Sequence, residues 1–395
     1  MEVRLPGTGG GNGWPQPGCP CASCARARSA GRRREPARVL VDGVLRIDAG
    51  RPPASSPGHG VERVAGGWAV TGPDGARLLV AEGPGAVLEP PDGTDHPDST
   101  GHPDSTGHPD STGHPDSTGH HGQPYDIVLL DLLDNPAQLG ALRRRGLVRP
   151  STVAAVLHAD HRISSEEELA RRCGFWGVIV PQDGDVLTAA AGTPATADGG
   201  TGADQGPAAG RPGQPRRVLV LGGARSGKSR HAELRLAAEP EVTYLAAGPY
   251  PGRADPAGDP DWARRVAAHR ARRPRWWQTV ESTDAAKFLR NGTGVILFDG
   301  AGTWLAAVMA EAGAWDGAAG AGDRITAEVD ELVGAWRQTR ARVVAVSDEV
   351  GSSIHPPTDS GRLFRDQLGW LNQRLAGEAE EAVLLIAGRV LTLPP

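Results

Sequence analysis

The chain has 395 residues, a length that predicts two or three domains. Its net charge of −5 argues against a nucleic-acid-binding protein, which usually has a basic excess. No apolar run reaches the roughly eighteen residues of a membrane span, and residues 1–6 do not resemble a signal peptide. Only four cysteines are present, which argues against a secreted disulfide framework. We therefore expect a cytoplasmic protein with no membrane span and no nucleic-acid partner.

Two segments are predicted to be linkers. From residue 96 to residue 119 the hexapeptide His-Pro-Asp-Ser-Thr-Gly occurs four times, without any apolar residue. Such a segment cannot bury enough surface to offset its ordering entropy, so residues 91–120 are predicted to be disordered. Loose metal binding by the repeated histidines is the alternative. Residues 188–216 consist largely of Ala, Gly, Pro, Thr and Asp and predict a second flexible linker.

Before the second linker, short apolar runs alternate with turns rich in glycine and proline. These runs predict strands at residues 37–41, 44–47, 68–70, 76–80, 126–133, 152–157 and 177–180. Helices are predicted at residues 136–146 and 165–172. The acids at 166–168 would lie in the first turn of the second helix, where they suit the helix dipole.

Three cysteines, Cys19, Cys21 and Cys24, follow the spacing C-x-C-x-x-C. Three thiols on one tight loop can bind one soft cation, with a fourth ligand from elsewhere in the chain. The alternative is three independent surface cysteines.

A phosphate-binding loop is predicted at residues 222–229, which match the pattern G-x-x-x-x-G-K-[ST]. The apolar run 217–221 predicts a buried strand before the loop, and residues 230–238 predict a helix after it. Glycines let successive N–H groups point inward, Lys228 would reach the β- and γ-phosphates, and Ser229 would bind Mg²⁺. A chance match in a glycine-rich turn is the alternative. The predicted loop residues are Gly222, Gly223, Ala224, Arg225, Ser226, Gly227, Lys228 and Ser229.

The rest of the chain alternates between predicted strands and helices. Strands are expected at 242–247, 294–299, 342–347 and 382–387, and helices at 259–270, 325–341 and 363–376. This order predicts an α/β domain over residues 217–395, with a mostly parallel sheet and ligands at the carboxyl ends of its strands. Asp299 ends one such strand and is the predicted Walker B acid that completes the Mg²⁺ shell. A loop aspartate without a metal is the alternative.

Arginines crowd residues 264–277 around one histidine, His269. We expect phosphates to compensate this positive charge. We also expect the cationic surroundings to keep the imidazole neutral, the form that can attack phosphorus. A solvated basic face with an incidental histidine is the alternative.

Residues 217–393 resemble the adenosylcobinamide kinase/adenosylcobinamide-phosphate guanylyltransferase family. The resemblance depends on the phosphate-binding loop, on His269-Arg270-x-x-Arg273-Pro274-x-Trp276, and on segments 346–351 and 364–373. It implies a bifunctional enzyme of cobalamin biosynthesis. Such an enzyme phosphorylates adenosylcobinamide with ATP or GTP, then transfers GMP from GTP through a GMP-histidine intermediate to give adenosylcobinamide-GDP.

The resemblance also implies roles for single residues. His269 and Lys228 would be catalytic, Mg²⁺ would be the cofactor, and the domain would be a homotrimer. The further nucleotide-binding positions that it implies are Ala246, Ala247, Gly248, Arg270, Ala271, Arg272, Arg273, Glu281 and Asp299.

The chain departs from the family pattern at three places. Asp348 replaces the usual asparagine, residues 300–304 are Gly-Ala-Gly-Thr-Trp instead of Cys-Leu-Thr-x-Trp, and residues 249–258 lengthen a loop. These departures affect the expected corrinoid affinity more than the expected nucleotide binding.

Residues 1–90 and 121–187 resemble a partial, degenerate metallo-β-lactamase-like α+β domain of the phosphodiesterase branch. The resemblance depends on segments 7–10 and 47–50, on the cysteine loop, and on His158-x-x-His161. It implies that His161 completes a structural Zn²⁺ site with the three cysteines. A hydrogen-bonded pair of loop histidines is the alternative. The H-x-H-x-D-H motif of a binuclear hydrolase is missing, so that activity is not expected.

Three other functions stay open at this point. The protein could be a P-loop small-molecule kinase or NTPase without the guanylyl step. It could be a hydrolase run by its N-terminal domain. Its first half could also be a non-catalytic fusion that only tethers or oligomerises.

Overall fold

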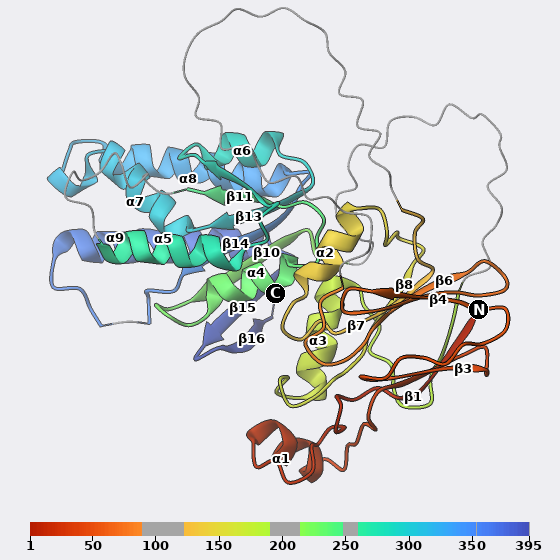
Figure 1. Cartoon of the computed structure of the whole chain (residues 1–395). Coiled ribbons are helices and arrows are strands. Elements are labelled where there is room, and N and C mark those ends of the chain that lie inside the picture. Colours follow the sequence, from red (N-terminus) through yellow and green to blue (C-terminus); the bar gives the residue numbers. More distant parts are fainter. Residues whose placement is uncertain (89–121, 190–213, 248–259, 353, 395) are drawn as a thin grey trace, which may run out of the picture. The chain divides into compact units, whose positions relative to one another are not determined.

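The computed structural model describes residues 1–88, 122–189, 214–247, 260–352 and 354–394 (Figure 1). Segment 91–120, most of segment 188–216 and the insert 249–258 lie outside these ranges, as does Gly248. The chain divides into two compact units, one of Met1–Cys173 with Val178–Pro194 and one of Gly174–Gly177 with Ala195–Pro395. Among the described helices, none has the length and the apolar composition needed to cross a membrane.

The first unit contains two β-sheets. One has the strand order β3-β2-β1-β9 and is antiparallel throughout. The other has the order β4-β5-β6-β7-β8, in which β4 to β6 are antiparallel and β6 to β8 parallel. The strands are β1 Glu2–Gly7, β2 Arg38–Val41, β3 Leu45–Asp48, β4 Gly60–Val64, β5 Gly67–Thr71, β6 Arg77–Ala81, β7 Ile127–Leu130, β8 Val153–Val156 and β9 Val186–Thr188. The helices are α1 Ala22–Ser29, α2 Ala137–Arg144 and α3 Glu166–Trp176.

Alternate residues of these strands build the core of the first unit. Val3 and Leu5 of β1 point into the same apolar cluster as Leu78 of β6 and Leu129 of β7. Side chains on a strand alternate between its two faces, so each sheet contributes one apolar face to the cluster. The first unit is therefore held together between its two sheets.

The second unit is built on one seven-stranded sheet in the order β12-β11-β13-β14-β10-β15-β16. All neighbouring strands are parallel except β15 and β16. The strands are β10 Arg217–Gly222, β11 Thr243–Ala246, β12 Gln278–Glu281, β13 Val295–Asp299, β14 Arg342–Asp348, β15 Glu381–Ile386 and β16 Arg389–Leu393. The helices are α4 Lys228–Leu236, α5 Pro260–Arg272, α6 Ala285–Asn291, α7 Ala301–Glu311, α8 Ala321–Gln338 and α9 Asp359–Gly377, with a 3₁₀ turn η1 at Ala314–Asp316. The predicted α/β domain with a mostly parallel sheet is confirmed.

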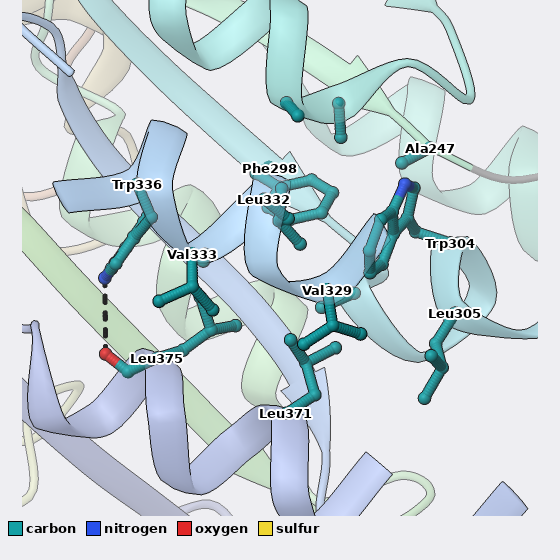
Figure 2. Close-up of a cluster of buried hydrophobic side chains, with 14 of the residues drawn as sticks. Ala247, Phe298, Trp304, Leu305, Val329, Leu332, Val333, Trp336, Leu371 and Leu375 are labelled. Atoms are coloured by element: carbon teal, nitrogen blue, oxygen red, sulfur yellow. Dashed lines mark hydrogen bonds between the residues drawn. The ribbon is translucent and has the colours of Figure 1, made fainter. Parts of the chain in front are cut away.

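Both faces of this sheet are covered. Leu219 and Leu221 of β10 point into a cluster with α6, α7, α8 and α9, whereas Val218 and Val220 point to the opposite face, which α4 covers. Figure 2 shows the larger cluster, where the indole Trp336 Nε1 donates a hydrogen bond to the Leu375 carbonyl at 3.2 Å. Because both faces are apolar, polar ligands are left the carboxyl edge of the strands.

The sequence predictions differ from the structure at several elements. The strand predicted at 177–180 is wrong, since Ile179 makes only an isolated bridge with Ala155 after α3 ends. Gly177 has a φ of 60°, which turns the chain away from the strand direction there. The short or exposed elements β1, β4, β9, β12, β16, α1, α6 and α7 were not predicted. β4, for example, has mostly exposed residues and lacks the apolar alternation of a half-buried strand.

Candidate functional site

The loop between β10 and α4 has the backbone that the phosphate-binding motif predicts. Gly227 has a φ of 97° at the N-cap of α4, and Arg225 has a φ of 56°. Ser226 N–H donates to the Gly223 carbonyl at 3.2 Å, which closes the turn. A Cβ at Gly222 would lie 2.4 Å from Ser226 Oγ, so only glycine fits there. The helix therefore begins with N–H groups free for an anion.

Lys228 and Ser229 are the first residues of α4 and face two aspartates at the ends of neighbouring strands. Lys228 Nζ lies 2.7 Å from Asp348 Oδ1, and 3.4 Å from the Gly223 carbonyl oxygen. Ser229 Oγ donates a hydrogen bond to Asp299 Oδ1 at 3.3 Å. The predicted pair of Ser229 and Asp299 is therefore brought together at the mouth of the loop.

Asp299 keeps its negative charge although it is nearly buried. Burial opposes the charge, but the contact with His269 and the Tyr244 hydroxyl, which donates at 2.6 Å, together lower the pKa of Asp299. A charged carboxylate next to a serine hydroxyl offers the hard oxygen ligands that Mg²⁺ prefers. The donor set thus fits the predicted magnesium site.

His269 does not have the cationic surroundings that the sequence predicts. Its Nδ1 lies 3.5 Å from Asp299 Oδ2 and 3.5 Å from Glu233 Oε1. Asp299 first, and then Glu233, stabilise the imidazolium and raise the pKa of His269 to about 9. The expectation of a neutral imidazole is therefore wrong for the nucleotide-free protein, because carboxylates from α4 and β13 face the ring.

The arginines beside His269 are largely compensated by the protein itself. Arg272 Nε lies 2.8 Å from Glu233 Oε2, and Arg270 pairs with Glu281 at 3.1 Å. The Arg273 guanidinium stacks on the Tyr244 ring at 3.6 Å from the ring centre, and its Nε donates to the His269 carbonyl. The expectation that phosphates alone balance this charge is thus corrected: acids and an aromatic ring occupy the three guanidiniums.

The remaining predicted residues surround this cluster less closely. Ala246 ends β11, and its carbonyl accepts the Ser282 N–H at 3.2 Å. Ala247 is fully buried, while Ala224 and Ala271 are exposed. Glu233 and Tyr244 were not predicted as site residues. Glu233 follows Ser229 by four positions and so shares its face of α4, a spacing that could have identified it.

In the first unit, Cys19, Cys21, Cys24 and His161 offer ligand atoms that all lie within 4.8 Å of one another. Cys21 caps α1, and its Sγ accepts the Cys24 N–H at 3.4 Å. Gln16 N–H points at Cys24 Sγ at 3.3 Å. Burial raises the pKa of the Cys24 thiol to about 11. His158 lies apart from this group, with its Nε2 hydrogen-bonded to the Ala81 carbonyl oxygen at 3.1 Å.

Comparison with known proteins identifies the second unit. The sequence profile of a family described as cobinamide kinase / cobinamide phosphate guanyltransferase matches residues 218–393. The bifunctional adenosylcobalamin biosynthesis protein CobU of Escherichia coli is 35% identical over 181 residues, which cover 43% of this chain and 96% of that protein. The chain belongs to the cobinamide kinase / cobinamide phosphate guanyltransferase family.

A second relative supports the assignment. The bifunctional adenosylcobalamin biosynthesis protein CobP of Pseudomonas aeruginosa is 36% identical over 183 residues, covering 45% of this chain and 96% of that protein. Among solved structures, the assembled ATPase EscN of enteropathogenic E. coli covers 44% of this chain and 43% of its own, with a TM-score of 0.27 and 12% identity. That likeness is too low to support an inference. The family match lies within the second unit.

Proposed function

We propose that this protein phosphorylates adenosylcobinamide and then transfers GMP from GTP to the product, giving adenosylcobinamide-GDP in cobalamin biosynthesis. Membership of the cobinamide kinase / cobinamide phosphate guanyltransferase family supports both activities. One geometric observation supports the second activity most directly. Asp299 contacts both Ser229 of the phosphate-binding loop and the His269 ring, so the cradle and the ring belong to one site.

The guanylyl step begins with the imidazole. Since Nδ1 faces Glu233 and Asp299, we propose that Nε2 attacks the α-phosphorus of GTP. A nitrogen–phosphorus bond forms, the bond to the bridging oxygen breaks, and pyrophosphate leaves. In the second half, a phosphate oxygen of adenosylcobinamide phosphate attacks the same phosphorus and releases His269. Because His269 is protonated at rest, its attacking form requires the loss of one proton, and the two carboxylates are the nearest acceptors.

The kinase step uses the loop. We propose that the N–H groups of residues 222–229 and Lys228 bind the β- and γ-phosphates of ATP or GTP. Ser226 Oγ supports this role, since it is buried and has no hydrogen-bond partner among the described residues. Ser229 and Asp299 would hold Mg²⁺, which neutralises charge on the transferred phosphoryl group.

A mass measurement tests the histidine intermediate. Incubation of the full chain with GTP and Mg²⁺ is expected to add one acid-labile GMP. His269→Ala is expected to abolish the adduct and keep the kinase activity, whereas His355→Ala, at an exposed histidine that pairs with Arg365, is expected to retain both. A GMP adduct that persists in His269→Ala would disprove the assignment of the nucleophile. Kinase activity without any adduct in the wild type would favour the small-molecule kinase.

We also propose a structural Zn²⁺ held by Cys19, Cys21, Cys24 and His161. Three sulfurs and one nitrogen within 4.8 Å of one another fit the ligand set of a closed tetrahedral zinc site. The N–H groups of Gln16 and Cys24 that point at sulfur would stabilise thiolate charge. Metal analysis of the purified chain, with Cys24→Ser as the comparison, tests this site.

The first unit we propose to be a degenerate metallo-β-lactamase-like domain without hydrolase activity. Arg162 supports this, because its guanidinium contacts Asp131, Asp134 and Asp160 at 2.8 to 2.9 Å and so neutralises the acids near His158. An assay of phosphodiester hydrolysis tests the proposal. A cytoplasmic homotrimer remains an expectation from the family resemblance, and light scattering of the full chain tests the trimer.

A further inference from the structure

Asp348 stands at the edge of the phosphate-binding loop. It is the last residue of β14, and its Cα lies opposite that of Gly222, where the loop begins. The Asn372 side chain donates to the Asp348 carbonyl at 2.9 Å and to no other strand end, while its Oδ1 accepts from Ser347 Oγ at 2.6 Å. The backbone of Asp348 is therefore held in place from α9, and its side chain has a defined origin.

The two carboxylate oxygens of Asp348 have different surroundings. Oδ1 lies 2.7 Å from Lys228 Nζ, whose side chain is only 16% exposed. Oδ2 faces the first turn of α7, where a Cβ at Gly302 would lie only 3.2 Å away. The absence of a side chain at Gly302 thus leaves room for the carboxylate beside the loop, and the start of α7 provides a favourable dipole for it.

The contact of Asp348 with Lys228 competes with the triphosphate. The Lys228 ammonium is the group that we propose to bind the β- and γ-phosphates, and in the free protein it is already paired with a carboxylate. A phosphate that binds Lys228 therefore enters next to a second negative charge. The repulsion grows with the charge of the ligand, so it is larger for a free triphosphate than for one that a divalent cation has partly neutralised.

We propose that Asp348 is a specificity-determining residue that holds Lys228 in the free protein and selects metal-bound triphosphates over metal-free ones. This inference rests on the proposed nucleotide site, and it goes beyond that site by giving Asp348 a role that opposes binding. Substitution at most positions of a binding site weakens binding. Here the removal of one charge at Asp348 is expected to strengthen it.

The test compares the full-length wild type with Asp348→Asn, which keeps the size of the side chain and removes its charge. The matched control is Glu349→Gln, which removes the charge of the next residue, whose carboxylate instead accepts the Gly351 N–H at 2.8 Å. The probe is the β,γ-imido analogue of ATP, titrated calorimetrically in EDTA and in excess Mg²⁺. Asp348→Asn is expected to lower Kd about tenfold in EDTA and less than about threefold in Mg²⁺.

Each outcome decides between explanations. Weaker binding of Asp348→Asn in Mg²⁺ would identify Asp348 as a metal ligand and overturn the inference. Equal effects in EDTA and Mg²⁺, or the same effects in Glu349→Gln, would also overturn it, because a general change in charge or structure would then suffice. If neither the wild type nor the variants bind the probe in Mg²⁺, the proposed nucleotide site itself is wrong. Tighter binding confined to EDTA supports the role of Asp348.

Discussion

The two side-chain clusters of this protein solve the problem of buried charge in opposite ways. In the first unit, burial raises the pKa of Cys24 to about 11, so the thiol stays neutral unless a cation replaces its proton. In the second unit, Asp299 is also nearly buried, but internal hydrogen-bond donors lower its pKa and keep it charged. The thiol cluster is therefore incomplete without a metal, whereas the phosphate-binding cluster is compensated by its own residues.

The difference has a consequence for ligands. Lys228 pairs with Asp348, Arg272 with Glu233, and His269 lies between Glu233 and Asp299. A nucleotide must exchange its phosphates for these internal partners, so its net affinity is the difference between two sets of ion pairs. A zinc ion in the first unit would instead gain its ligands without displacing any salt bridge among them.

The largest expected effect is on the kinase step. Lys228→Met removes the ammonium proposed to bind the transferred phosphate and is expected to slow phosphorylation of adenosylcobinamide about 10³-fold. Lys287→Met, at an exposed lysine of α6, is the control and should keep the wild-type rate. A rapid-quench assay with labelled ATP measures both. A fall of less than about tenfold would contradict the proposed role of Lys228.

The next effect is on the stability of the first unit. Arg34 is 2% exposed, and its guanidinium binds both Glu166 oxygens at 2.6 and 2.7 Å. Arg34→Met leaves a largely buried carboxylate without its partner and is expected to cost about 3 kcal/mol of unfolding free energy. Chemical denaturation measures this loss. Arg33→Met, at an arginine that is 77% exposed, should change the stability little, and nucleotide binding should persist in both variants.

Metal removal should affect the same unit somewhat less. Chelation, or Cys24→Ser, is expected to cost about 2 kcal/mol at a free zinc concentration roughly 30 times the Kd. Calorimetric scans with and without chelator check this. The transition of the second unit, assigned by its shift with Mg²⁺ and nucleotide, should not move. A chelator-insensitive first transition would show that the thiol cluster is stable without a cation.

The smallest effect concerns pH. The pKa of His269 is raised to about 9, so its interaction with Asp299 and Glu233 stabilises the fold fully below the unfolded value of 6.5. This stabilisation is lost as the pH rises through about 9. His269→Gln is therefore expected to be less stable than the wild type by about 1 kcal/mol at pH 6, and equal to it near pH 10. Thermal unfolding at both values measures the difference. A deficit that does not change with pH would contradict the ion pairing.

Much of the second unit was predictable from local pattern. The glycines and the lysine of the phosphate-binding loop, and the apolar strand that ends in Asp299, follow spacings that only a few backbones satisfy. The cysteine spacing likewise predicted a cluster, and the family resemblance added His161. What the pattern did not contain was Glu233, whose role depends on α4 and α5 lying side by side. For the same reason it mispredicted the charge of His269.

The sequence by itself determined which residues can bind phosphates and soft cations, because those capacities belong to residue types at short spacings. It determined the alternation of strands and helices, and hence the sheet edge where a ligand binds. Only the tertiary structure decided the partners of each charge: Asp348 opposite Lys228, and Asp299 and Glu233 opposite His269. These contacts join residues far apart in the chain, and electrostatic energy depends on distance in space rather than on position in the sequence.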